Sequence, residues 1–221
     1  MAANSKIEWT DHTFNPWVGC TKISRACDYC YAEGWAKRAG SPELWTGERR
    51  RTSVANWKLP IKWNREAPLA GVQRKVFCAS LADVFDNQAD PQWRSDLFQM
   101  VEDTPNLIWQ LLTKRPQNIE KMVWPKGDAG WPWNIWIGTT VESQDEAHKR
   151  LPHLVRVPAH VRFISYEPAL SGVNFTPWLA DIHWIIAGGE SGPGARHFDA
   201  EWARSVRDQC ARAGTAFFMK Q

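Results

Sequence analysis

The sequence contains no uninterrupted apolar stretch near the roughly 18 residues that a membrane-spanning helix needs. Residues 1–6 lack the apolar core of a secretory signal peptide. We therefore expect neither a membrane protein nor a secreted one, and we place the chain in the cytoplasm. Disulfide bonds are uncommon in that compartment, so the five cysteines need another explanation.

A strong charge imbalance and a dinucleotide-binding glycine motif are also missing. The 27 basic and 24 acidic residues leave a net charge of +3, which is too small to demonstrate nucleic-acid binding but allows a local basic face. No Gly-x-Gly-x-x-Gly sequence opens a predicted helix, which argues against a dinucleotide-binding fold. The 221 residues, 43% of them hydrophobic, are typical of one globular domain, which we expect to span 1–221.

Short apolar runs alternate with amphipathic segments along the chain. The runs predict strands at residues 7–10, 75–80, 107–112, 134–139, 161–165, 182–188 and 215–219. Helices are predicted at residues 31–39, 91–104, 116–123, 144–156 and 200–213, with a loop and a short helix at 41–69. This alternation indicates an α/β fold with a parallel sheet, and six to seven βα units favour a partial or near-complete parallel (β/α) barrel.

Three of the cysteines lie close together, in a loop at residues 20–30. Six residues separate Cys20 from Cys27, and two separate Cys27 from Cys30. A structural zinc site needs four ligands, and a fourth is not obvious. Three cysteines on a [4Fe–4S] cluster would leave one iron open for chemistry. An iron–sulfur site, a structural metal site and functionally unrelated cysteines are the three interpretations that the residues allow.

Polar side chains follow most of the predicted strands. In parallel barrels the active site lies at the carboxyl ends of the strands, so these side chains are expected to face one site. The set comprises Ser80, Asp83, Thr113, Lys114, Arg115, Thr139, Thr140, Glu142, Ser143, Ser165, Tyr166, Glu167 and the glycine-containing segment 188–192. Each also has a structural interpretation, such as helix capping by Ser143.

Several other polar residues have mainly structural interpretations. The basic run 49–51 is typical of a solvated face, with phosphate contact as the alternative. We expect His12, His183 and His197 to be ordinary polar residues. Cys78 and Cys210 are expected to be buried thiols.

The end of the cysteine loop, Cys27-Asp28-Tyr29-Cys30, resembles the cluster loop of radical S-adenosylmethionine (SAM) enzymes, although that family usually has three residues between its first two cysteines. Other segments extend the likeness over essentially the whole chain, to a phage-associated family of three-cysteine, radical-SAM-like proteins. They are residues 6–10, 15–16, 19–22, 27–33, 112–116, 138–142, 167–168, 188–196, 207–210 and 217–221. Members of this family continue past the final Lys-Gln, so we expect a short or absent C-terminal lid.

The resemblance implies a [4Fe–4S] cluster held by Cys20, Cys27 and Cys30, with SAM on the open iron. Tyr29 would lie against the adenine, and Lys114 or Arg115 would bind the SAM carboxylate. Other residues that the resemblance assigns to cofactor binding are Ser80 and Asp83 for the ammonium, Glu142 or Ser143 for the ribose, and Thr139, Gly188, Gly189 and Glu190. Glu167 beside Tyr166 is expected to bind substrate or transfer a proton.

The resemblance therefore predicts an enzyme that cleaves SAM to methionine and a 5′-deoxyadenosyl radical, which then modifies or rearranges a nucleic-acid base, as in phage DNA hypermodification. Such an enzyme needs an electron donor and, if phage-encoded, works in the host cytoplasm. The first alternative is a non-catalytic nucleic-acid-binding protein with a zinc site, His12 being the candidate fourth ligand. The second is an iron–sulfur redox protein with complete protein ligation.

Overall fold

The computed structural model describes residues 5–123, 130–192 and 194–220. Residues 193 and 221, which belong to two of the family-resembling segments, lie outside this part of the chain, and the expectation of a short or absent C-terminal lid stays a prediction. Within it, seven strands form one sheet in the order β1-β4-β5-β6-β7-β8-β9, and all neighbouring pairs are parallel. The strands are β1 His12–Thr13, β4 Arg74–Cys78, β5 Leu107–Thr113, β6 Ile135–Thr140, β7 Val161–Tyr166, β8 Trp184–Ala187 and β9 Ala216–Met219. The predicted partial parallel barrel is confirmed as an open half-barrel.

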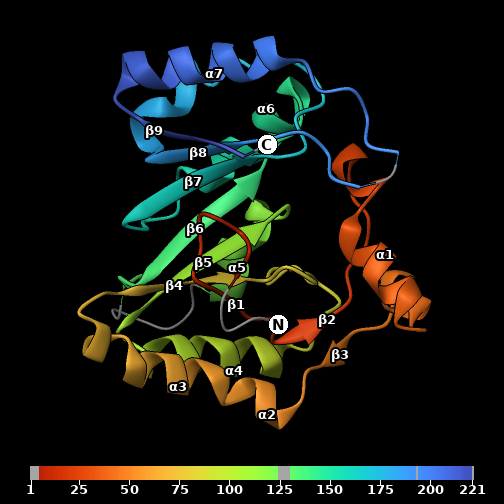
Figure 1. The fold of residues 1–221 in the computed structure, drawn as a ribbon, viewed down its shortest axis with the longest axis vertical. Coiled ribbons are helices and arrows are strands. Elements are labelled where there is room, and N and C mark those ends of the chain that lie inside the picture. Colours follow the sequence, from red (N-terminus) through yellow and green to blue (C-terminus); the bar gives the residue numbers. More distant parts are fainter. Residues whose placement is uncertain (1–4, 124–129, 193, 221) are drawn as a thin grey trace.

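Helices connect most of these strands. They are α1 Tyr31–Arg38, α2 Val54–Trp57, α3 Leu59–Glu66, α4 Pro91–Glu102, α5 Ile119–Val123, α6 Gln144–Leu154 and α7 Ala200–Ala213. Figure 1 shows α7 beside β9 at one end of the sheet, α3 and α4 near β4 at the other, and α1 on the side where β2 and β3 lie. A short antiparallel pair, β2 Trp17–Val18 and β3 Arg50–Arg51, precedes and follows the cysteine loop.

Side-chain capping explains where the long helices begin. The backbone nitrogen of Gln92 donates to Asp90 at 2.8 Å at the start of α4, and that of Glu201 donates to Asp199 at 2.8 Å before α7. Ser143 caps α6 in the same way, at 3.4 Å. Gly214 ends α7 in a left-handed conformation, as the sequence predicts.

The two faces of the sheet bury different partners. The outer face packs under α4, α6 and α7, where Val76, Leu111 and Ile185 are fully buried. The inner face carries a separate cluster of Trp9, Phe77, Phe163 and Ile186. Strand alternation therefore decides which side chains can reach the hollow of the half-barrel.

The predicted first strand at residues 7–10 is wrong, since these residues form a turn and β1 is His12–Thr13. Trp9 instead packs against Phe77, with ring centroids 4.8 Å apart, and against Trp184 at 6.0 Å. The buried indole covers the inner face of the sheet, and this packing outweighs the local alternating pattern that predicts a strand.

The basic run also differs from expectation. Arg50 is exposed, but the side chain of Arg49 is 2% exposed and pairs with Asp86 at 2.6 Å. Arg51 pairs with Asp96 at 2.6 Å and lies over the ring of Trp57. Arg50 and Arg51 are both exposed and fit the predicted solvated face, whereas Arg49 does not.

Candidate active site

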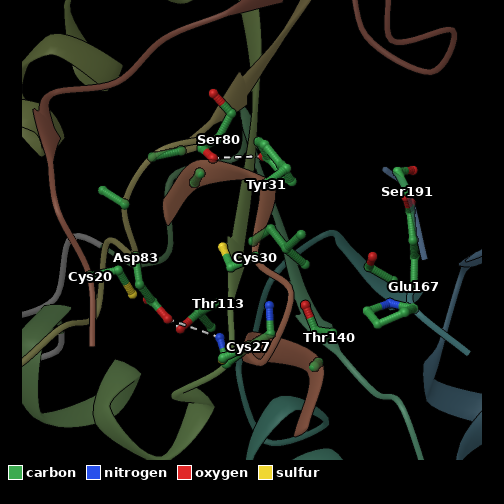
Figure 2. A pocket seen from close by; sticks show the side chains of 18 of the residues that line it. Cys20, Cys27, Cys30, Tyr31, Ser80, Asp83, Thr113, Thr140, Glu167 and Ser191 are labelled. Atoms are coloured by element: carbon green, nitrogen blue, oxygen red, sulfur yellow. Dashed lines mark hydrogen bonds between the residues drawn. The ribbon is translucent and has the colours of Figure 1, made fainter. Parts of the chain in front are cut away.

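The three loop cysteines line one cavity of about 520 Å³, together with residues from the carboxyl ends of β4, β5, β6 and β7. In Figure 2, Cys20 lies on one side of this cavity, Cys27 and Cys30 are central, and Glu167 and Ser191 lie across from Cys20. Eleven of the sixteen residues predicted for the site line it: Cys20, Cys27, Tyr29, Cys30, Ser80, Asp83, Lys114, Arg115, Glu167, Gly189 and Glu190. The other five are Thr139, Glu142, Ser143, Tyr166 and Gly188.

A tight turn delivers Cys20 to the cavity. Gly19 has a φ of 113°, and a Cβ atom on it would come within 2.8 Å of the carbonyl oxygen of Leu44. Only glycine adopts this turn without strain. The backbone nitrogen of Cys20 then donates to Leu44 at 3.0 Å, which fixes the start of the loop.

An ion pair between Asp83, which follows β4, and Arg115, which follows the neighbouring strand β5, supports Cys20. Arg115 donates to Asp83 at 3.0 Å, to the carbonyl oxygen of Thr21 at 2.9 Å and to Sγ of Cys20 at 3.7 Å. Asp83 also accepts from the hydroxyl of Thr113 at 2.6 Å and the backbone nitrogen of Lys114 at 3.0 Å. The hydrogen bonds of Asp83 and Arg115 therefore hold the strand end after β5 and the cysteine loop in place.

Burial, together with the negative charge of Asp83, raises the pKa of Cys20 to about 11, although Arg115 opposes the rise. Without a metal, this thiol is protonated at neutral pH. Metal coordination would have to release that proton.

The middle of the loop is held from β6. The carboxylate of Glu142, which is 1% exposed, accepts from the backbone nitrogen of Ala26 at 3.3 Å and from Arg150 at 2.7 Å. Thr139 donates to the carbonyl oxygen of Thr113 at 2.8 Å, and Ser143 caps α6. These three residues were predicted to bind the cofactor, but the structure does not bring them to the cavity.

The end of the loop is held from the segment after β8. Glu190 accepts from Arg196 at 2.6 Å, and Arg196 also donates to Asp28 at 3.1 Å and to the carbonyl oxygen of Arg25 at 2.8 Å. The guanidinium lies 5.0 Å from the ring centroid of Tyr29. Hydrogen bonding to Arg196 lowers the pKa of Glu190 below its ordinary value.

Arg49 ties the first half of the loop to the segment after β4. Its guanidinium donates to Asp86 at 2.6 Å, to the hydroxyl of Thr21 at 2.6 Å and to Gln88 at 2.9 Å. Four arginines, Arg49, Arg115, Arg150 and Arg196, thus act directly or through a carboxylate on the stretch between Cys20 and Cys30.

The two residues predicted for catalysis separate in the structure. Glu167 lines the cavity and forms an ion pair with Lys220, which lines it too. Tyr166 is fully buried on the opposite face of β7, where its hydroxyl donates to the carbonyl oxygen of Ser171 and its ring packs against Phe175. Alternation along β7 sends Ser165 and Glu167 to the cavity and Tyr166 away from it.

Ser80 and Lys114 reach the cavity with different constraints. The hydroxyl of Ser80 accepts from Asn15 at 3.0 Å, and its carbonyl oxygen accepts from Tyr31 at 2.6 Å, as the dashed line in Figure 2 shows. Within the described residues, the ammonium of Lys114 has no hydrogen-bond or ion-pair partner, although it lines the cavity. It is therefore free to bind an anion there.

The two glycines after β8 serve different purposes. Gly188 continues the strand pairing, since its nitrogen donates to Tyr166 at 3.1 Å and its oxygen accepts from Ala169 at 2.9 Å. Gly189 lines the cavity, and a Cβ atom there would meet Phe198 at 3.0 Å. A side chain at position 189 would therefore crowd Phe198.

Sequence reasoning did not single out Tyr31, Arg196 or Lys220 as site residues. Arg196 and Lys220 appeared only within family-resembling segments, and no local pattern pairs them with Glu190 and Glu167. Tyr31 directly follows the third cysteine, which was a usable signal.

The thiols share a cavity without converging on one point. In the described part of the chain, no group of three His, Cys, Asp or Glu residues lies close enough together to hold a metal ion. His12, the candidate fourth zinc ligand, stacks on Trp63 at 4.3 Å and lines a different cavity. Cys78 and Cys210 are buried in the core, as predicted. No helix in residues 5–123, 130–192 or 194–220 is both long and apolar enough to cross a membrane.

Solved structures of spore photoproduct lyase share this fold. A cysteine-to-serine variant superposes with a TM-score of 0.63 at 13% identity, covering 98% of this chain and 78% of the lyase. The lyase complexed with dinucleoside spore photoproduct gives 0.61 at 12% identity, with coverage of 98% and 78%. A double variant with bound AdoMet (SAM) and the same dinucleoside gives 0.61 at 11%, with coverage of 97% and 77%. At these identities the likeness establishes the fold alone, an α/β half-barrel with a parallel sheet.

Comparison with curated proteins gave no match. A family model described as "Protein of unknown function (DUF5131)" matches residues 4–221. The match spans almost the whole chain, and this protein belongs to that family.

Proposed function

We propose that this protein is a radical SAM enzyme that acts on a nucleic-acid base, with residues 1–221 working as one catalytic domain. The observation that carries the proposal is the position of Cys20, Cys27 and Cys30. All three line a single cavity at the carboxyl ends of parallel strands, where (β/α) barrels place their chemistry.

The donor set fits a [4Fe–4S] cluster. Thiolates are the usual ligands of such clusters, and three of them leave one iron for SAM. The thiols do not converge in the ligand-free structure, so cluster binding has to turn them toward one another. Cys20 and Cys30 are only partly buried, which leaves their side chains room for that movement. The proposed ligands are Cys20, Cys27 and Cys30.

We divide the proposed cofactor-site residues into two groups according to their positions in the fold. Tyr29, Ser80, Lys114 and Gly189 line the cavity and are proposed to contact SAM, with the unpartnered ammonium of Lys114 binding its carboxylate. The second group holds the loop and the strand ends in place: Asp83, Arg115, Thr139, Glu142, Ser143, Gly188 and Glu190. When bound and reduced, the cluster and SAM supply a 5′-deoxyadenosyl radical that abstracts hydrogen from the substrate.

The substrate is proposed to lie on the side of the cavity formed by β6, β7 and the chain end. Thr140, Ser165, Glu167 and Lys220 provide polar groups there, above the apolar surface of Trp9. Glu167 is proposed to bind substrate or to move a proton, and Lys220 holds its carboxylate in place. Tyr166 has no direct part in this proposal because it faces away from the cavity.

The nucleic-acid assignment is supported by what the structural neighbours bind. One spore photoproduct lyase structure has AdoMet and dinucleoside spore photoproduct bound, and another is complexed with the dinucleoside. For this chain we propose a base or nucleoside as substrate, as in phage DNA hypermodification. Isomerase, transferase and lyase outcomes are all compatible with the cavity. An electron donor is required, and a reducing cytoplasm, that of the host if the chain is phage-encoded, suits its five free cysteines.

The proposal is tested by loading the protein anaerobically with iron and sulfide, reducing it and adding SAM. A radical SAM enzyme will contain about four irons per chain, and SAM will change the electron paramagnetic resonance spectrum of the reduced cluster. A zinc-stabilised binding protein will hold zinc and show no such spectrum. A redox protein with four protein ligands will hold the cluster, but SAM will not perturb it.

A further inference from the structure

Arg196 links the segment after β8 to the cysteine loop. Its guanidinium donates to Glu190, to the carboxylate of Asp28 and to the carbonyl oxygen of Arg25. It also lies over the ring of Tyr29. Four partners from two distant parts of the chain therefore meet at one side chain.

The partners of Arg196 within the loop all lie between the predicted ligands Cys20 and Cys30. This stretch includes the short 3-10 helix Arg25–Cys27, in which the nitrogen of Asp28 donates back to Arg25 at 3.2 Å. The carbonyl oxygen of Arg25 accepts from both Asp28 and Arg196, so the guanidinium reinforces the local turn. Figure 1 shows the segment that precedes α7 reaching across to this loop, near α1.

The Glu190 side of this network is buried, whereas the Asp28 side is exposed. The side chain of Glu190 is 5% exposed and that of Arg196 is 22% exposed, whereas that of Asp28 is 52% exposed. Glu190 also accepts from the backbone nitrogen of Arg196 at 3.0 Å, which closes a compact turn. Glu190 thus fixes the guanidinium, and the guanidinium in turn holds the more exposed partners on the loop.

Tyr29 is the partner whose position depends most on this contact. Tyr29 is 54% exposed, yet it lines the cavity. Among described residues, the guanidinium of Arg196 is the one cation placed over this ring. An exposed ring without that contact samples several rotamers, and ordering it on ligand binding costs free energy.

We propose that Arg196 is a positioning residue that orders Tyr29 and the Cys27 end of the loop for SAM, with Glu190 as its anchor. This inference rests on the proposed function for the identity of the ligand. Arg196 acts through Tyr29 and the loop backbone, and it does not itself touch the cluster. Its loss weakens SAM binding without reducing the iron content.

The experiment compares Arg196→Gln with Arg204→Gln in the full-length chain. Arg204 is a matched control because it is an exposed arginine on α7 whose ion pair with Glu201 is local. Arg196→Lys adds a geometric test, because a lysine can pair with Glu190 but cannot serve all the partners of a planar guanidinium. Each variant is examined for hydrogen exchange in residues 25–30 without metal, for iron content after loading and for the SAM dissociation constant.

For Arg196→Gln we expect exchange at the amides of Cys27 and Asp28 to be about tenfold faster, and SAM to bind about tenfold more weakly, at unchanged iron content. Arg204→Gln will match the wild type in all three measurements. Arg196→Lys will recover thermal stability but not the full loop protection or SAM affinity.

Wild-type exchange rates and wild-type SAM affinity in Arg196→Gln would overturn the inference. A purely structural role would lower the melting temperature and leave the SAM dissociation constant of the folded protein unchanged, which would also overturn it. Failure of the wild type to bind SAM would instead contradict the proposed function. The exchange measurement on metal-free protein then still decides whether Arg196 orders the loop.

Discussion

The carboxylate of Glu142 accepts a hydrogen bond from the backbone nitrogen of Ala26 at 3.3 Å, which links the end of β6 to the middle of the cysteine loop. The other carboxylate oxygen of Glu142 accepts from Arg150. A residue predicted to bind the ribose of SAM thus has its acceptors occupied by the scaffold. The loop is positioned by buried ion pairs in addition to its own sequence.

We expect Arg150→Met to destabilise the protein by about 3–5 kcal/mol, because it leaves the buried Glu142 carboxylate without its cation. Urea unfolding followed by tryptophan fluorescence measures this loss. Lys149→Met is the control, since the Lys149 side chain is 67% exposed and pairs on the surface with Glu146. It should leave the urea unfolding midpoint close to that of the wild type. Equal effects of the two variants would contradict the buried-pair account.

Single changes of Cys20, Cys27 or Cys30 to alanine should each abolish cluster binding. Cys78→Ala and Cys210→Ala should leave the iron content intact, because both thiols are packed in the core behind the sheet. Iron and sulfide analysis after anaerobic loading measures the difference. A full complement of iron in any of the first three variants would remove that cysteine from the ligand set.

Glu167→Gln should separate substrate chemistry from cofactor binding. Glu167 forms an ion pair with Lys220, and among the described residues it has no hydrogen bond or ion pair with the cysteine loop. Iron content and SAM affinity should therefore stay at wild-type values, while turnover of the nucleic-acid substrate falls. Weaker SAM binding by this variant would place Glu167 among the cofactor ligands.

The ion pair of Glu190 and Arg196 predicts a defined dependence of stability on pH. Folding lowers the pKa of Glu190, so the pair contributes its full stability above the ordinary glutamate pKa of about 4.3. That contribution disappears as pH falls through the lower pKa of the folded state. The melting temperatures of wild type and Arg196→Gln should differ at pH 7 and converge in acid. A difference that persists unchanged below pH 3 would argue against this linkage.

A substitution at Gly138 tests how tightly the inner face of the sheet is packed. A Cβ atom at this position would collide with the ring of Phe163, so Gly138→Ala should cost about 1–3 kcal/mol in urea unfolding. Phe163→Leu in the same chain should recover part of the loss. Gly34→Ala within α1 is the control, because its Cβ would be in ordinary contact with Arg38 and alanine favours the helix. A neutral Gly138→Ala would show that the ring moves freely.

The apolar runs in the sequence predict six of the seven sheet strands to within a few residues, and most of these runs are buried in the structure, although β9 at the edge of the sheet is partly exposed. The exception, residues 7–10, shows how one large side chain overrides a short alternating pattern. Trp9 leaves the sheet plane to cover Phe77 and Trp184. The local strand propensity of four residues cannot predict that long-range contact.

The candidate site was likewise only partly predictable from local sequence patterns. The carboxyl ends of strands predict which residues come near the cavity, and eleven of sixteen reach it. Alternation along β7 could have excluded Tyr166, since Glu167 and its neighbour cannot face the same side. The arginine contacts could not be predicted, because Arg196 and Asp28 are 168 residues apart and meet only in the folded chain.

The central claim is that the three-cysteine loop supports radical SAM chemistry. The most direct measurement is 5′-deoxyadenosine release by anaerobically loaded, reduced protein given SAM, with Cys27→Ala as the control. We predict release by the wild type and none by the variant. A fully loaded, reduced wild type that neither binds SAM nor releases 5′-deoxyadenosine, even with candidate nucleic-acid substrates present, would contradict the account.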